Sequence, residues 1–310
     1  MTPRLTASPS TYAGPNARRA SLELILAGAL WGFAFIAQRM ALESWTPLAM
    51  MSLRFGLAFL VSLPFILLMP SIRSLSFMRE ARAAFAPGLL LGLVLTLQTY
   101  GLKSTSIANS GFITTLYVLF VPLFCSWGLK QAPPHGHSRV VMIALIGAAL
   151  MCEVHRARLS MGDLWTFGCA VVGAVQIAWV GWAAPEVQSP FLFNTFQSFW
   201  VAIGTLAFTL PFETIHLSGV TQRAWFGLGY QIIGATLLAF FIQIRAQRVL
   251  SSSTASILFL LEAPFAAVFG YICFRETLSL WQLSGAVIIL AACFRAARLK
   301  PGAHISEKRG

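Results

Sequence analysis

The sequence predicts an all-α integral membrane protein with ten transmembrane helices in two inverted five-helix repeats. Three observations predict this fold: the composition, a series of apolar runs, and an internal match at a nearly constant spacing. Of the 310 residues, 57% are hydrophobic and 10% are charged, whereas soluble domains carry about 25% charged residues. Such a composition excludes a disordered chain. Five cysteines are too few for a disulfide-stapled secreted module.

The apolar runs are separated by proline, glycine and charged residues. A helix needs about 20 residues to cross ~30 Å of hydrocarbon, and backbone groups in lipid must be satisfied within each segment, so each run is expected to be a helix. The first run follows Arg18 and Arg19 and is longer than a signal-peptide core, so it should remain as an anchor. The fifth is the shortest, because Glu153 and Arg156 follow it closely. The runs are 22–42, 47–69, 84–103, 107–129, 139–153, 161–184, 190–212, 224–246, 252–274 and 279–298.

A repeat search divides these runs into two halves of five. The matches lie 142 or 143 residues apart: Thr46-Pro47 with Ser189-Pro190, Leu91-Gly92 with Ile233-Gly234, and Pro122 with Pro264. Because five is odd, the second half must enter the membrane from the opposite side, which gives the inverted repeat found in many transporters. The predicted division is a polar tail (1–21), repeat 1 (22–153), a linker (154–160), repeat 2 (161–298) and a basic tail (299–310).

The distribution of positive charge predicts the orientation. With the N-terminus in the cytoplasm, 15 Lys and Arg residues lie at inside ends or tails and 6 at outside ends. Positive charge favours the cytoplasmic side, so both termini are expected there. The formal charge of +12 shows no basic stripe interleaved with aromatics, so we expect membrane lipids and not nucleic acid as its partner.

Several strings resemble the ten-helix branch of the drug/metabolite transporter superfamily, which is built from two EamA-type repeats. The resemblance covers about residues 22–298 and implies a bacterial inner-membrane exporter of small metabolites, with the aromatic amino acid exporters called YddG as one plausible branch. Two positions depart from the pattern: Pro134 stands where the first repeat should have an acidic residue, and Ala263 separates Glu262 from Pro264. The strings are Leu30-Trp31-Gly32, Arg39, Pro47, Arg54, Leu261-Glu262-Ala263-Pro264-Phe265-Ala266-Ala267, Gly270, Arg275-Glu276, Gln282 and Gly285.

Polar side chains at mid-depth are the candidates for solute contact, because an ionisable group there costs about 2.5–3.5 kcal/mol and normally faces a cavity or partner. Glu262 is the deepest acid, and it is predicted to bind a substrate amine or a coupling proton, or else to bond a neighbouring helix or Arg54. Arg54 is predicted to brace the second helix or take part in gating. Pro122 and Pro264 each deprive a carbonyl four residues earlier of its N–H partner, which predicts structural or gating roles.

The other candidates are amide and aromatic residues within the runs. Gln176 and Trp179 are three residues apart and share a helix face, which would suit an amphipathic solute. For any one of these residues, ordinary helix packing is the alternative role. The set is Trp31, Gln98, Tyr117, Gln176, Trp179 and Gln243.

These features favour a secondary transporter that exports small organic solutes, most plausibly amino acids, and the alternatives are export of a nucleobase or cationic drug. No GxxxxGK[ST] motif is present, so a gradient or simple facilitation must drive movement. An intramembrane enzyme is disfavoured because Glu262 has no histidine companion in the apolar runs; a non-transporting receptor is the third alternative. No cofactor is expected, and His135 and His137 lack the further ligands of a metal site. Whether the chain forms a homodimer is left open.

Overall fold

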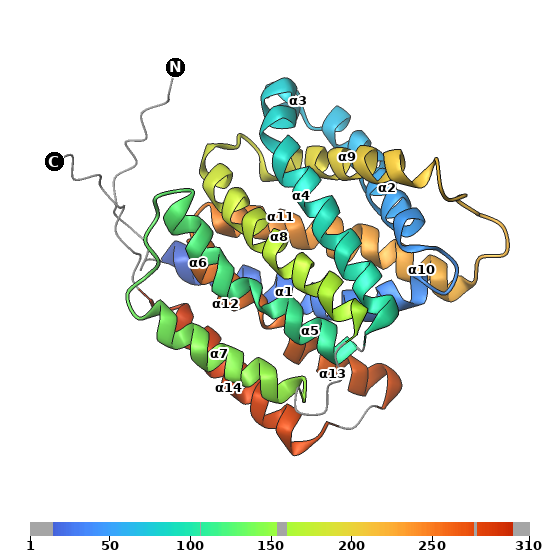
Figure 1. The fold of residues 1–310 in the computed structure, drawn as a ribbon. Helices are drawn as coiled ribbons and strands as arrows, with labels where there is room; N and C mark the ends of the chain where they lie inside the picture. Colours follow the sequence, from blue (N-terminus) through green and yellow to red (C-terminus); the bar gives the residue numbers. More distant parts are fainter. Residues whose placement is uncertain (1–14, 106, 154–159, 276–277, 300–310) are drawn as a thin grey trace.

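The structure is a computed structural model that describes residues 15–105, 107–153, 160–275 and 278–299. Every regular element within these ranges is helical, as predicted (Figure 1). The tails at 1–14 and 300–310, most of the predicted linker (154–159) and Glu276 lie outside the described residues.

From the N-terminus to residue 151, the elements cover the first five predicted runs. They are α1 (Pro15–Ala41), α2 (Pro47–Leu68), the short α3 (Pro70–Arg73), α4 (Phe77–Ser104), α5 (Ile107–Thr115), α6 (Tyr117–Trp127) and α7 (His137–Met151). The remaining elements cover the last five runs. They are α8 (Met161–Ala183), the 3₁₀ turn η2 (Ala184–Glu186), α9 (Pro190–Thr209), α10 (Gln222–Tyr230), the π-helix η3 (Gln231–Leu238), α11 (Ala239–Gln247), α12 (Ser252–Phe259), α13 (Glu262–Phe274) and α14 (Leu280–Ala296).

Length and hydropathy identify the membrane-crossing elements. Within the described residues, eight helical segments are long and apolar enough to cross a membrane. The two other apolar helices, α7 and α14, are shorter, at 15 and 17 residues. Large apolar side chains lie on the outside of the bundle, for example Leu68 at 78% exposure and Phe294 at 61%. In water such a surface would be costly, whereas in lipid it is the expected exterior.

Two helices begin at the Thr-Pro and Ser-Pro pairs that the repeat search singled out. In α2 the Thr46 hydroxyl accepts a hydrogen bond from the Ala49 amide at 3.4 Å, and Pro47 occupies the first turn. In α9 the Ser189 hydroxyl accepts from the Leu192 amide at 3.4 Å, and Pro190 follows it. Hydroxyl caps satisfy first-turn amides, and proline fits there because it lacks an N–H. The predicted starts at 47 and 190 are confirmed.

The third membrane helix is longer than its apolar run predicts. Helix α4 begins at Phe77 and not near residue 84, with the Ser76 hydroxyl accepting from the Arg79 amide at 3.4 Å. The prediction was wrong because the charged residues Arg79, Glu80 and Arg82 lower the hydropathy of the first turns, so the apolar run begins later than the helix does. Here Glu80 is fully buried, and one of its carboxylate oxygens accepts from the Gln188 amide at 2.7 Å.

Two of the predicted continuous helices are interrupted near their middle. The run 107–129 is interrupted at Leu116, between α5 and α6, and the run 252–274 is interrupted at Leu260 and Leu261, between α12 and α13. At the second break the Leu260 carbonyl accepts from the Ala263 amide at 3.3 Å. The expectation that Pro264 leaves this carbonyl free is therefore wrong. A tighter turn satisfies it instead, at the cost of helix continuity.

The helices pack in a pattern that leaves α7 and α14 beside each other at one edge (Figure 1). Helix α4 packs against α8 and α9, α2 against α9, and α1 against α10, α11 and α13. At the α7–α14 crossing, a Cβ on Gly285 would lie 2.4 Å from the Gly147 carbonyl oxygen. Such close approach requires glycine. Several of the other helices line a central cavity.

Candidate functional site

The cavity lies in the middle of the bundle and offers about 120 Å³ for the centres of water-sized molecules. Since about 10–15 Å³ by this measure accommodates one water, the space suits a small organic molecule. Its walls come from α1, α2, α4, α5, α6, α8, η3, α11, α12 and α13. The lining residues are Trp31, Ala34, Phe35, Gln38, Arg54, Leu91, Val94, Leu95, Gln98, Thr114, Tyr117, Cys169, Gly173, Gln176, Ile177, Gln231, Phe240, Gln243, Phe259 and Glu262.

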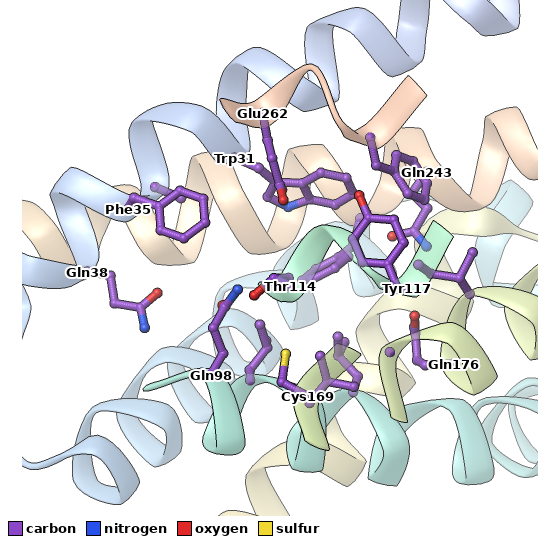
Figure 2. A pocket seen from close by; sticks show the side chains of 18 of the residues that line it. Trp31, Phe35, Gln38, Gln98, Thr114, Tyr117, Cys169, Gln176, Gln243 and Glu262 are labelled. Carbon is purple, nitrogen blue, oxygen red and sulfur yellow. The ribbon is translucent and has the colours of Figure 1, made fainter. Parts of the chain in front are cut away.

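Glu262 brings a carboxyl group to this cavity from the first turn of α13 (Figure 2). Its position follows from the break at Leu260 and Leu261, which brings the start of α13 to the cavity wall. The Glu262 side chain makes no hydrogen bond or ion pair with any other described residue, so the predicted link to Arg54 is absent. Its carboxyl group is available to a solute or a proton.

Arg54 brings a guanidinium group to the same cavity from α2. Its Nε donates to the Thr236 hydroxyl at 2.7 Å, and the residue is 3% exposed. This hydrogen bond ties α2 to the π-helix η3, in keeping with the predicted bracing role. The cavity therefore contains an acidic and a basic group that do not neutralise each other.

Trp31 supplies the principal flat apolar surface. Its indole N–H donates to the Ala235 carbonyl at 3.2 Å, and its ring centroid lies 5.4 Å from that of Phe240 and 5.3 Å from that of Phe259. The next residue, Gly32, lets α13 approach, because a Cβ there would lie 2.7 Å from the Phe265 Cβ. A glycine at this position therefore permits close packing of α1 against α13.

Amide and hydroxyl groups occupy the remaining polar positions. The side-chain amides of Gln98 and Gln176 make no hydrogen bond with other described residues, although both line the cavity. The Tyr117 and Thr114 hydroxyls are buried without a partner in the described structure. Gln243 donates to the Gln247 side-chain oxygen at 3.0 Å. Unsatisfied buried groups are costly, so these side chains are suited to bind water or a polar solute.

With this geometry in view, the chain was compared with known proteins. Residues 19–152 and 160–297 each match the model of the EamA-like transporter family. The chain belongs to this family. It is 28% identical over 273 residues to an uncharacterized transporter of Archaeoglobus fulgidus, covering 88% of this chain and 84% of that protein. It is 20% identical over 284 residues to the uncharacterized transporter YoaV of Bacillus subtilis, covering 88% and 94%.

A solved structure described only as the crystal structure of a protein shares the fold. Its TM-score is 0.75 at 16% identity, and the match covers 91% of this chain and 96% of the other. The family and the apolar helices make the EamA-like chain a multi-pass membrane protein of a transporter family.

Of the residues that the sequence singled out in this EamA-like transporter, most line the cavity and three do not. Trp31, Arg54, Gln98, Tyr117, Gln176, Gln243 and Glu262 lie on its walls, whereas Trp179, Pro122 and Pro264 do not.

Trp179 is the clearest misplacement, because it is 39% exposed and its ring packs against that of Trp182 at 6.4 Å. Residues advance by about 100° along a helix, so Trp179 lies about 160° around α8 from Ile177, which faces the cavity. Gln176 and Trp179 are neighbours on the surface of α8, but only Gln176 lies on the part of that surface that lines the cavity.

Two glutamines that line the cavity of the transporter, Gln231 and Gln38, are not in the set that the sequence singled out. Gln231 donates to the Ala34 carbonyl at 2.8 Å, and its side-chain oxygen has no partner among the described residues. Gln38 donates to the Thr99 hydroxyl at 2.9 Å. Both amides lie within apolar runs, and that signal could have found them.

Proposed function

We propose that the chain is a secondary transporter that exports small organic metabolites, most notably amino acids including aromatic ones, across the inner membrane of a bacterium. The observation that carries the proposal is the central cavity, where an unpaired carboxyl group and free amides lie beside the Trp31 ring. This combination provides a charged or hydrogen-bonding contact for the polar end of a solute and a flat contact for an apolar one.

Glu262 is proposed to bind the amine of the solute or a coupling proton. A carboxyl group without a protein partner, in a cavity between apolar helices, is stabilised when it binds a cation or a proton. The unpaired carboxyl also favours the second candidate function, export of a cationic compound. The aromatic amino acid exporters called YddG remain one plausible branch for this chain because of the Trp31 surface.

Alternating access between two inverted halves is proposed as the mechanism. The packing supports this mechanism because helices at equivalent places in the two halves make equivalent contacts. Helix α1 packs on α13 as α8 packs on α6, and two equivalent pairs pack on each other, α2 on α9 and α7 on α14. Both interrupted spans, at Leu116 and at Leu260–Leu261, occupy equivalent places in the two halves. Broken helices at a midplane site are common in transporters built this way.

The proposed orientation places both termini in the cytoplasm, on the basis of the 15 inside and 6 outside basic residues. Cysteine substitutions at the tails, labelled from one side of sealed membranes, test this directly. Labelling of either tail only from the periplasmic side would contradict it.

The transport proposal is tested with purified protein in vesicles. Vesicles loaded with radiolabelled leucine or phenylalanine should release the label faster than protein-free vesicles do. Competition by amino acids, nucleobases and cationic drugs then ranks the solute classes, and an imposed pH gradient reports coupling to protons. No protein-dependent movement of any compound contradicts the proposal, whereas movement of cationic drugs alone favours the second candidate.

A further inference from the structure

We propose that Arg54 binds the carboxylate of the solute and so selects compounds that carry a carboxylate together with an amino group. This inference rests on the proposed function, and it assigns a substrate contact to a residue that the sequence favoured as a brace for α2.

The guanidinium of Arg54 has more donors than the protein uses. It carries five N–H donors, and only the one on Nε is bonded, to the Thr236 hydroxyl at 2.7 Å. The Nη donors make no hydrogen bond with other described residues, and no described carboxylate lies within ion-pair distance. The side chain is 3% exposed yet lines the cavity. Its remaining donors are therefore free to meet a group that enters the cavity.

Burial of the Arg54 guanidinium is costly unless an anion binds its remaining N–H donors. An unpaired buried charge is strongly destabilising, whereas a carboxylate can bind two guanidinium N–H groups at once. Glu262 lines the same cavity but lies beyond ion-pair distance of Arg54. A carboxyl group and a guanidinium group that are held apart in one cavity complement a zwitterion. An amine alone would leave Arg54 unpaired, and an acid alone would leave Glu262 unpaired.

The π-helix η3 holds the guanidinium in place before any solute arrives. Asn194 on α9 donates to the carbonyls of Thr236 and Leu237, at 3.0 and 3.3 Å. The acceptor of Arg54 is thus fixed from a second helix. Prior positioning lowers the ordering cost of binding, so the carboxylate contact should contribute strongly to affinity.

The test measures binding separately from transport. Thermal unfolding of the purified protein is followed while two matched ligand series are titrated: leucine, 3-methylbutylamine and 4-methylpentanoate, and phenylalanine, phenethylamine and 3-phenylpropionate. The apparent Kd comes from the concentration dependence of stabilisation. For the wild type, the amino acid is expected to bind 10- to 100-fold more tightly than the matched amine, as for a charged hydrogen bond.

Arg54→Gln should reduce this ratio to within about threefold of unity, while the Kd of the amine changes little. Arg54→Lys should keep part of the ratio, because it retains the charge without the planar fork, and it serves if the glutamine variant does not fold. Arg39→Gln, at an exposed position on α1, is the matched control and should keep the full ratio.

Each outcome bears on the inference. If Arg54→Gln and Arg54→Lys weaken the amino acid and the amine by the same factor, Arg54 is only a brace and the inference is wrong. If the wild type binds amino acid and amine equally, the inference is also wrong, while transport of amines stands. A wild type that responds to none of the six compounds contradicts amino acid transport itself, and this inference with it.

Discussion

Replacement of Gly285 by alanine should destabilise the protein, because the added Cβ meets backbone that cannot rotate away. It would lie 2.4 Å from the Gly147 carbonyl oxygen, 2.4 Å from the Met151 nitrogen and 2.8 Å from the Met151 Cα. Helices α7 and α14 must separate to relieve these contacts. Overpacking costs about 1–3 kcal/mol, and these short distances place Gly285→Ala near the upper limit. Alanine recovers about 1 kcal/mol through its helix propensity, which leaves a net loss of about 2 kcal/mol.

Gly56→Ala on α2 is the matched control, since no atom lies within 4 Å of the position its Cβ would take. It gains the helix propensity without a clash, so it should stabilise by roughly 0.5–1 kcal/mol. At about 2–4 °C per kcal/mol for a large domain, Gly285→Ala should lower the Tm by about 4–8 °C and Gly56→Ala should raise it by about 1–4 °C. Tryptophan fluorescence of detergent-solubilised protein measures both. A Gly285→Ala protein at least as stable as Gly56→Ala would refute the packing argument.

Three further predictions concern the cavity and its surroundings. Glu262→Gln should lower efflux from loaded vesicles or flatten its pH dependence without reducing the yield of folded protein; unchanged efflux at every pH would remove Glu262 from the mechanism. Trp31→Ala should weaken the competition of phenylalanine in the vesicle assay by about tenfold, because an aromatic contact is lost. Trp179→Ala should leave this competition unchanged. Equal effects of the two substitutions would contradict the assignment of Trp31 to the cavity wall. Gly181→Ala should place a Cβ 1.9 Å from the Ser252 hydroxyl oxygen and lower the Tm by a few degrees, which thermal unfolding will show; an unaltered Tm would mean that the serine rotates away without cost.

The sequence predicts the helical class and the places of the membrane helices. The free energy of transfer into the membrane is a sum over about 20 residues, so single residues change it little. It does not predict the start of α4, because Glu80 is buried through a hydrogen bond to a distant loop. The sequence likewise does not predict the helix breaks at Leu116 and Leu260. A proline permits a break nearby but does not determine at which residue the helix is interrupted.

For the candidate site, residue type was more informative than residue position on a helix. Gln98, Gln176 and Glu262 were found because polar groups within apolar runs are rare. Trp179 was misplaced because the neighbours of a helix determine which of its sides faces the cavity, and α8 is apolar over most of its length. Gln231 could have been found by the same rule that found Gln98.

The π-helix η3 links the cavity to three neighbouring helices through consecutive residues. Trp31 on α1 bonds the carbonyl of Ala235, and Arg54 on α2 and Asn194 on α9 bond the hydroxyl and the carbonyl of Thr236. A guest molecule that draws on the indole or the guanidinium therefore pulls on one short stretch of chain. Since α1, α2 and α9 are all hydrogen-bonded to Ala235 or Thr236, a displacement of these two residues would act on all three helices together.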